Sequence, residues 1–290
     1  MNIKGIIPAL ITPFHDDFSV NHDALGQLVE HHIAAGADGF YVCGSTAECF
    51  LLSADERKAV VETVVKVNNG RVPIIAQIGN IGTAHAVELA KHAADAGVDA
   101  VSSVPPFYFK FSVDEIAGYY EAIAKAADLP VVIYSIPAFS GVAITSENIK
   151  KIIDASGAQG LKYTAQDLFE LERIRRANPE LTIFSGYDEI MASALPIGID
   201  GSIGSTFNVM LHKYKVLCDA YARGDNATVS AKQTEVNRII DVLIKVGVNP
   251  GIKYLLTQEG IPCGDCRPPF GKLSQESKDL LDSIRADIRI

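Results

Sequence analysis

A lysine in an apolar stretch has the most distinctive chemistry in this sequence. Lys162 lies in the run 159–164, whose other residues are typical of a buried strand. Lysine is almost never fully buried without a partner. One explanation is an ion pair at the end of the strand. The other is functional, because burial favours the neutral amine, which can attack a carbonyl carbon. Hydroxyl-bearing residues at neighbouring strand ends favour this second interpretation.

Other polar residues follow the apolar runs, and each has a structural and a functional interpretation. Tyr134 ends one run and is either a core aromatic or a proton carrier for carbonyl–amine chemistry. Ser45 and Thr46 could cap a helix or bind a carboxylate at its start, and these two roles are compatible. Asp188 and Glu189 could be first-turn acids of a helix or could accept hydrogen bonds from a polyol.

Metal, phosphate and serine-nucleophile chemistry are not indicated. The histidines include His31, His32 and His85 in helical patterns, and the sequence has no His/Asp/Glu spacing typical of a metal site. There is no glycine-rich loop that could cradle a phosphate, and residues 204–206 lack the strand–turn–helix context of a serine nucleophile. The sequence therefore predicts neither a metal nor another cofactor.

Composition narrows the class of protein. The chain has 290 residues, is 48% hydrophobic and carries a net charge of −9, which disfavours a nucleic-acid partner. No stretch approaches the ~18 consecutive apolar residues of a membrane helix, and the first residues do not resemble a signal peptide. The odd count of five cysteines favours reduced thiols, so we expect a cytoplasmic protein. Cys263 and Cys266 lack a second ligand pair, which favours two loop thiols over a metal or redox site.

Short apolar, β-rich runs alternate with amphipathic helical patterns, which predicts an α/β fold with a parallel sheet. Helical patterns between the runs include 22–35, 54–68, 83–96 and 113–126. Eight strands without a break in composition favour a closed (β/α)₈ TIM barrel over an open doubly wound sheet, which would need a glycine-rich turn after its first strand. The eight runs are Ile6–Thr12, Gly39–Gly44, Val72–Gly79, Ala100–Pro105, Val131–Ile136, Gly160–Thr164, Leu181–Ser185 and Gly201–Ser205.

A short internal repeat supports this organisation. Residues 36–39, 97–100 and 198–201 share the pattern Gly-x-Asp between a helix and a strand, and 157–160 is a weaker copy. The first glycine can adopt the left-handed conformation that ends a helix, and the Asp then begins the turn into the strand. We assign this repeat a structural role.

Beyond residue 224 the pattern is only helical, over 225–246, 251–259 and 275–288. We therefore expect residues 1–224 to form the barrel and 225–290 a C-terminal helical extension packed on it. A barrel would also gather the polar segments that end its strands around one opening, where barrel enzymes carry their active sites.

Four motifs together resemble the N-acetylneuraminate lyase and dihydrodipicolinate synthase superfamily, and the resemblance extends over essentially the whole chain. They are Gly44–Glu48, Tyr134–Ala138, Gly160–Thr164 and Gly186–Ile190. Three further stretches are more similar to the lyase branch, namely Ile136–Val142, Phe184–Ile190 and Asp200–Thr206.

The resemblance implies a homotetrameric barrel enzyme that reversibly cleaves N-acetylneuraminate, a sialic acid, to pyruvate and N-acetylmannosamine. Lys162 would form the Schiff base and Tyr134 would transfer the proton, with no cofactor. Ser45 and Thr46 would hold the keto-acid carboxylate, and Tyr108 would reach a neighbouring subunit. The residues expected to contact the sugar are Thr164, Gly186, Asp188, Glu189 and Ser205.

Two positions depart from the family pattern. Ala47 stands where the family usually has glycine, which could shift the carboxylate loop slightly. Phe139 stands where the synthase branch has an arginine for a second carboxylated substrate, which counts against a synthase. Two alternatives remain: another pyruvate-dependent enzyme of the superfamily, such as a dihydrodipicolinate synthase or a 2-keto-3-deoxy sugar acid aldolase, and a non-catalytic sugar-acid binding protein. The second would need neither Lys162 nor Tyr134.

Overall fold

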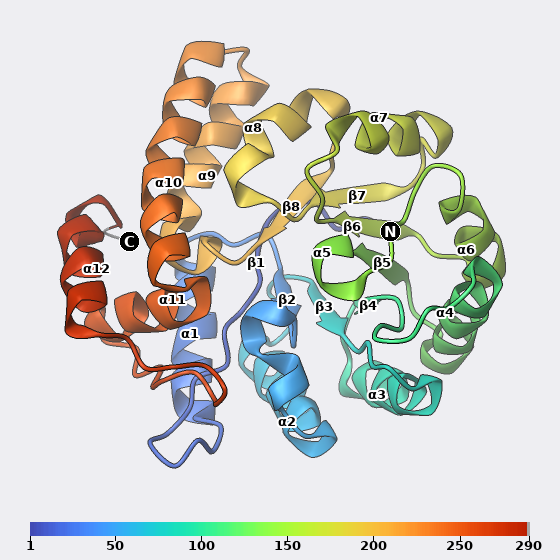
Figure 1. Ribbon diagram of the computed structural model, residues 1–290, viewed down its shortest axis with the longest axis horizontal. Coiled ribbons are helices and arrows are strands. Elements are labelled where there is room, and N and C mark those ends of the chain that lie inside the picture. Colours follow the sequence, from blue (N-terminus) through green and yellow to red (C-terminus); the bar gives the residue numbers. More distant parts are fainter. Residues whose placement is uncertain (289–290) are drawn as a thin grey trace. The chain divides into compact units, whose positions relative to one another are not determined.

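A computed structural model describes residues 1–288 (Figure 1). Each of the eight strands within these residues lies in one of the runs predicted from the sequence, although β1 begins one residue earlier and several strands are shorter. The strands are β1 (Gly5–Pro8), β2 (Phe40–Val42), β3 (Ile74–Gln77), β4 (Ala100–Ser103), β5 (Val131–Ser135), β6 (Gly160–Tyr163), β7 (Thr182–Ser185) and β8 (Gly201–Gly204).

Helices follow the strands along the chain. The predicted helices at 54–68 and 83–96 have the predicted bounds, and those at 22–35 and 113–126 differ by one residue at their C-terminal ends. The α-helices are α1 (His22–Ala34), α2 (Ala54–Asn68), α3 (Thr83–Ala96), α4 (Val113–Ala127), α5 (Pro137–Ser140), α6 (Ile149–Ser156), α7 (Leu168–Ala177), α8 (Met191–Ala194), α9 (Phe207–Ala222), α10 (Asn226–Val246), α11 (Val248–Gln258) and α12 (Gln275–Ile288).

The strands form one eight-stranded sheet in the order β1-β8-β7-β6-β5-β4-β3-β2. The strands at the two ends of this order are linked by a parallel bridge between Ala9 and Tyr41, with the Leu10 amide donating to the Tyr41 carbonyl at 3.0 Å. The predicted (β/α)₈ barrel with additional C-terminal helices is therefore confirmed. In the described part of the chain, no helix has both the length and the apolar character needed to cross a membrane.

The chain contains two compact units, the first formed by Met1–Gly5 and Pro73–Ile203. Its strands β3 to β8 pair in parallel, and the residues of these strands are buried on both faces. In this unit α3, α4 and α6 pack side by side along the strands (Figure 1). The apolar runs predicted this burial, because a parallel strand covered on both faces cannot alternate apolar and polar residues.

The second unit comprises Ile6–Val72 and the chain from Gly204 onward. Here α1 packs on α2, and α9 to α12 pack on one another (Figure 1). Ser53 begins α2 with a reciprocal capping box to Glu56. The boundary of the proposed extension at residue 224 stays a prediction, and its residues 289–290 lie outside the described part of the chain.

The Gly-x-Asp repeat has a structural role that explains its recurrence. Gly36, Gly97 and Gly198 have φ of 82°, 91° and 91°, as expected for a left-handed helix end. The carboxylate that follows accepts the backbone N–H at the start of a neighbouring strand in all three copies. The pairs are Asp38 with Ile6 (2.7 Å), Asp99 with Ile74 (2.8 Å) and Asp200 with Ile183 (3.0 Å).

Candidate functional site

Lys162 and Tyr134 lie side by side on adjacent strands of the first unit. Their Cα atoms are paired in the β5–β6 register, so both side chains extend from the same face of the sheet. The Lys162 Nζ lies 4.2 Å from the centroid of the Tyr134 ring. Lys162 is 4% exposed and Tyr134 is 3% exposed. A buried amine next to a phenol is a suitable pair for carbonyl–amine chemistry with proton transfer.

The neighbouring strand positions have a different role. Side chains alternate between the faces of a strand, so Ser135 and Tyr163 extend away from Tyr134 and Lys162. The Tyr163 hydroxyl donates to the Asp167 carbonyl at 2.9 Å, and burial raises its pKa. Tyr163 is therefore a structural tyrosine next to the candidate site.

Gly186 allows Thr164 to approach the backbone closely beside Lys162. A Cβ atom at this position would lie 1.8 Å from the Thr164 Oγ1 and 3.4 Å from the Lys162 Cε. Within the described residues, the Thr164 Oγ1 is buried and has no hydrogen-bond partner. Buried hydroxyls are normally paired, so this atom is a candidate contact for a ligand. Thr164, Gly186 and Lys162 were all predicted from the sequence, and the structure brings them together.

Asp188 and Glu189 begin a single 3₁₀ turn after β7, Asp188–Ile190. Asp188 is buried and Glu189 is half-buried. Burial raises the pKa of the Glu189 carboxyl above its usual range. Tyr187, the residue that precedes the turn, makes no side-chain hydrogen bond that caps it. A first-turn position is compatible with both interpretations of these acids, so their role as sugar contacts stays a prediction.

Ser45, Thr46 and Ser205 belong to the second unit. Ser45 and Thr46 lie inside a 3₁₀ turn, Ser45–Ala47, rather than capping α2. The Thr46 and Ser205 hydroxyls are 2.6 Å apart, so the structure brings these two predicted residues together. The Ala47 amide donates to the Gly44 carbonyl at 3.0 Å, which shows that alanine fits this turn.

The side chain of Tyr108 is 85% exposed and contacts Phe109 edge-on, with ring centroids 5.0 Å apart. Phe139, 76% exposed, lines with them a surface pocket of about 700 Å³. Tyr108 also has a φ of 78°, which is unusual for a bulky residue. Exposed aromatic side chains gathered at one pocket are typical of a contact surface.

Sequence reasoning missed residues that support the Ser45–Thr46 turn. The Asn249 Nδ2 donates to the Ser45 carbonyl at 3.4 Å, and Thr12 donates to the Ala47 carbonyl at 2.9 Å. Glu48 follows the turn and is paired with Lys253. Only the polarity of Glu48 next to an apolar run could have indicated its burial, and nothing in the sequence indicated its partner.

Cys263 and Cys266 are buried thiols. Burial raises the pKa of Cys263 and Cys266 to about 12, so both are protonated at neutral pH. Within residues 1–288 no group of three or more His, Cys, Asp or Glu side chains could hold a metal ion.

Comparisons with known proteins show which family the chain belongs to. The sequence matches the dihydrodipicolinate synthetase family over residues 2–287. It is 43% identical to the N-acetylneuraminate lyase of Enterobacter sp. (strain 638), an alignment that covers 99% of this chain and 98% of the relative.

Two solved structures are also similar over nearly the whole chain. The Clostridium difficile protein CdNal, in complex with mannosamine, has a TM-score of 0.97 at 36% identity, with 100% of both chains covered. A sialic acid aldolase of Ruminococcus gnavus, solved as a catalytic lysine mutant, has a TM-score of 0.96 at 30% identity, with 99% of this chain and 95% of that chain covered. From the family match over residues 2–287 and the 43% identical relative, we conclude that the chain belongs to the dihydrodipicolinate synthetase family.

Proposed function

We propose that the protein is a Schiff-base aldolase that reversibly cleaves N-acetylneuraminate to pyruvate and N-acetylmannosamine. The observation that carries the proposal is the buried Lys162 amine beside the Tyr134 ring, with the unpaired Thr164 hydroxyl packed against Gly186 next to it. The 43% identical relative from Enterobacter, an N-acetylneuraminate lyase, supports the choice of substrate.

In the proposed reaction, the Lys162 Nζ attacks the keto carbon of the open-chain sugar acid, and water leaves to give a protonated imine. This imine is an electron sink. The bond between the α- and β-carbons of this imine can therefore break while the hydroxyl on the β-carbon loses its proton. N-acetylmannosamine then leaves, the enamine on Lys162 takes up a proton, and hydrolysis releases pyruvate. The lysine supplies the electrophile, so the reaction as written needs no cofactor.

The other predicted residues have supporting roles in this proposal. Tyr134 transfers the proton, through either the substrate carboxylate or Thr46. Ser45 and Thr46 bind the carboxylate, because hydroxyls and N–H groups at the start of a helical turn favour anions. The predicted sugar contacts are Thr164, Gly186, Asp188, Glu189 and Ser205.

A synthase that accepts a second carboxylated substrate is disfavoured by Phe139. Its side chain is apolar and 76% exposed, so it cannot pair with a carboxylate. Another pyruvate-dependent aldolase would share Lys162 and Tyr134 and would differ at the sugar end. Incubating the protein with N-acetylneuraminate and with 2-keto-3-deoxy sugar acids, and assaying pyruvate, distinguishes these activities. Pyruvate release from the second class alone would contradict the proposed substrate.

We also propose a cytoplasmic homotetramer in which Tyr108 contributes to a neighbouring subunit. The exposed cluster of Tyr108, Phe109 and Phe139 supports a contact between copies, since such side chains favour burial. Sedimentation at assay concentration is expected to give the mass of a tetramer. A fully active monomer would refute the assembly without affecting the chemistry proposed for Lys162.

A further inference from the structure

Two non-glycine residues with left-handed backbone flank the Ser45–Thr46 turn. Cys43 has a φ of 57° and Glu48 a φ of 58°. Such conformations are disfavoured and persist only where surrounding contacts over-determine them, often at functional sites. The contacts that hold Glu48 in this conformation therefore also fix the turn.

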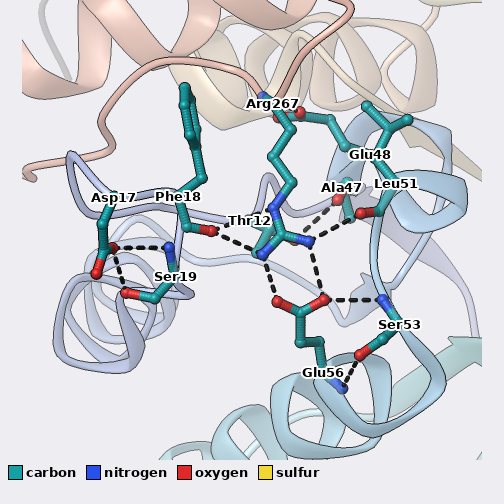
Figure 2. A network of polar contacts seen from close by, with 10 residues as sticks. All are labelled: Thr12, Asp17, Phe18, Ser19, Ala47, Glu48, Leu51, Ser53, Glu56 and Arg267. Carbon is teal, nitrogen blue, oxygen red and sulfur yellow. Dashed lines mark hydrogen bonds and ion pairs between the residues drawn. The ribbon is translucent and has the colours of Figure 1, made fainter.

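Glu48 directs its carboxylate into a fully buried ion pair. Its Oε1 lies 2.6 Å from the Lys253 Nζ, and the two side chains are 0% and 1% exposed. The Glu48 Oε2 accepts the backbone N–H of Arg267 at 2.8 Å (Figure 2). Lys253 also donates to the Asp265 carbonyl at 3.3 Å and lies 4.0 Å from the centroid of the Phe14 ring. Both charges thus have additional partners, as a buried pair requires.

Arg267 extends this network to the start of α2. Its guanidinium pairs with Glu56 and donates to the Leu51 carbonyl at 2.8 Å and to the Phe18 carbonyl at 2.7 Å (Figure 2). Donation from Arg267 lowers the pKa of Glu56 to about 2. Glu56 is also the capping-box partner of Ser53. Arg267 therefore contacts the segment that follows the turn at three positions, Glu48, Leu51 and Glu56.

A buried ion pair is weak evidence for stability, because its desolvation penalty can equal or exceed the attraction between the charges. An apolar pair of similar volume would fill the same space, but it would not form the polar contacts that fix the backbone conformation at position 48. Glu48 is joined directly to the turn, since its amide donates to the Ser45 carbonyl at 3.0 Å. The contacts of the Glu48 carboxylate therefore help to fix the positions of Ser45 and Thr46.

We propose that Glu48 and Lys253 are positioning residues that hold the Ser45–Thr46 turn in the geometry that binds the keto-acid carboxylate. This inference rests on the proposed function, because it assumes that the turn receives the carboxylate. Neither residue takes part in the chemistry at Lys162. Loss of the pair should therefore weaken the capture of carbonyl compounds that carry a carboxylate and leave the reactivity of the Lys162 amine unchanged.

The test compares two ketones in borohydride trapping on Lys162. Pyruvate carries the carboxylate and hydroxyacetone lacks it. The double substitution Glu48→Gln with Lys253→Met removes both charges, so that no unpaired charge stays buried. The matched control is Glu235→Gln with Lys213→Met, which removes an ion pair between α10 and α9 that includes another buried lysine. Glu48→Gln alone is a second variant, in which Lys253 keeps Phe14 and the Asp265 carbonyl as partners.

For the double variant, the pyruvate concentration that gives half-maximal trapping is expected to rise roughly ten- to a hundredfold, the effect of losing one hydrogen bond to a charged group. The corresponding hydroxyacetone concentration should change by no more than about twofold, because hydroxyacetone has no carboxylate and its binding loses no such hydrogen bond. The control should shift neither value. Glu48→Gln should show the same selectivity to a smaller extent.

Equal shifts for both ketones, or no shift for pyruvate, would overturn the positioning role, since a merely structural pair affects both compounds alike. If the unsubstituted protein traps no pyruvate on Lys162, the proposed function itself fails, and the inference fails with it. Normal trapping in the unsubstituted protein together with normal selectivity in both variants overturns the inference alone.

Discussion

At the scale of single residues, the proposed reaction depends on Lys162. Borohydride added with pyruvate is expected to fix a pyruvate-sized adduct on this residue, detected by peptide mapping and mass spectrometry. Lys162→Arg should lose both the adduct and the cleavage activity, because arginine stays protonated and cannot act as the nucleophile. Lys125, which is exposed and paired with Glu121, provides the control, and Lys125→Arg should retain both. An adduct on a different lysine would disprove the proposed mechanism.

Tyr134 is predicted to transfer a proton rather than only to fill space. Tyr134→Phe keeps the ring next to Lys162 and removes the hydroxyl. Turnover should then fall by about 10²–10⁴-fold, the usual contribution of general acid–base catalysis, while the melting temperature changes little. Steady-state rates and thermal unfolding of the same preparation measure the two effects.

The neighbouring strand offers a matched control for Tyr134. Tyr163 is also buried, and its hydroxyl donates to the Asp167 carbonyl on the other face of the sheet. Tyr163→Phe should reduce stability by about 0.5–1.5 kcal/mol, the net value of a typical hydrogen bond, and should leave turnover within a few-fold. If the two variants have equal turnover, Tyr134 is a core aromatic and another group moves the proton.

At the scale of elements, the 3₁₀ turn after β7 is predicted to set the substrate class. Asp188→Asn and Glu189→Gln should each lower the rate of sugar-acid cleavage roughly ten- to a hundredfold, because hydrogen bonds to a charged group contribute ~1.5–3 kcal/mol. Pyruvate trapping on Lys162 should hardly change, since this turn is assigned to the sugar. Parallel assays of cleavage, trapping and melting temperature measure the three effects.

The alternative for this turn makes the opposite prediction. If Asp188 and Glu189 only stabilise the start of the turn through its dipole, each variant should lower the melting temperature modestly and affect both ligands alike. A parallel fall in cleavage and trapping, or no fall in either, would remove these acids from the set of sugar contacts.

Much of the fold was predictable because the strands and several helices have a local signal. The apolar runs predicted the positions of the eight described strands, and the helical patterns predicted the observed bounds of α2 and α3. Gly36 and its equivalents predicted the helix ends, since only glycine adopts the left-handed conformation readily. Lys162 stood out because a lysine in an apolar strand is rare, and Tyr134 stood out because it ends an apolar run.

Contacts between residues distant in sequence were not predictable. The sequence did not indicate that Glu48 and Lys253 are paired, and only their pairing in the folded chain explains why both are buried. The Gly-x-Asp repeat was recognised as structural, but the sequence did not indicate that each Asp accepts an N–H from the neighbouring strand. Local patterns specify elements, whereas a polar contact between elements depends on the register in which they pack.

At the scale of the whole molecule, a buried histidine links folding to pH. His32 lies in α1 and is 1% exposed, and burial lowers its pKa to about 3. Its Nε2 lies 3.3 Å from the Asn208 Oδ1. The Asn208 amide nitrogen donates to the Ala9 carbonyl at 2.7 Å and to the Ser205 carbonyl at 2.8 Å. The Oδ1 is therefore an acceptor, and the Nε2 of neutral His32 carries the proton that it accepts.

The unfolded chain binds a proton at His32 below the ordinary pKa of 6.5, whereas the folded protein does not until about pH 3. Stability from this residue is therefore complete above pH 6.5 and is lost as the pH falls towards 3, at up to about 1.4 kcal/mol per pH unit. His32→Gln should be less stable at pH 7.5, where a cavity and a poorer contact to Asn208 remain, but its stability should fall less steeply between pH 6.5 and 4.5. Chemical unfolding at several pH values measures both slopes, with His85→Gln, an exposed position in α3, as the control. Identical slopes for His32→Gln and the unsubstituted protein would show that His32 does not govern the acid sensitivity.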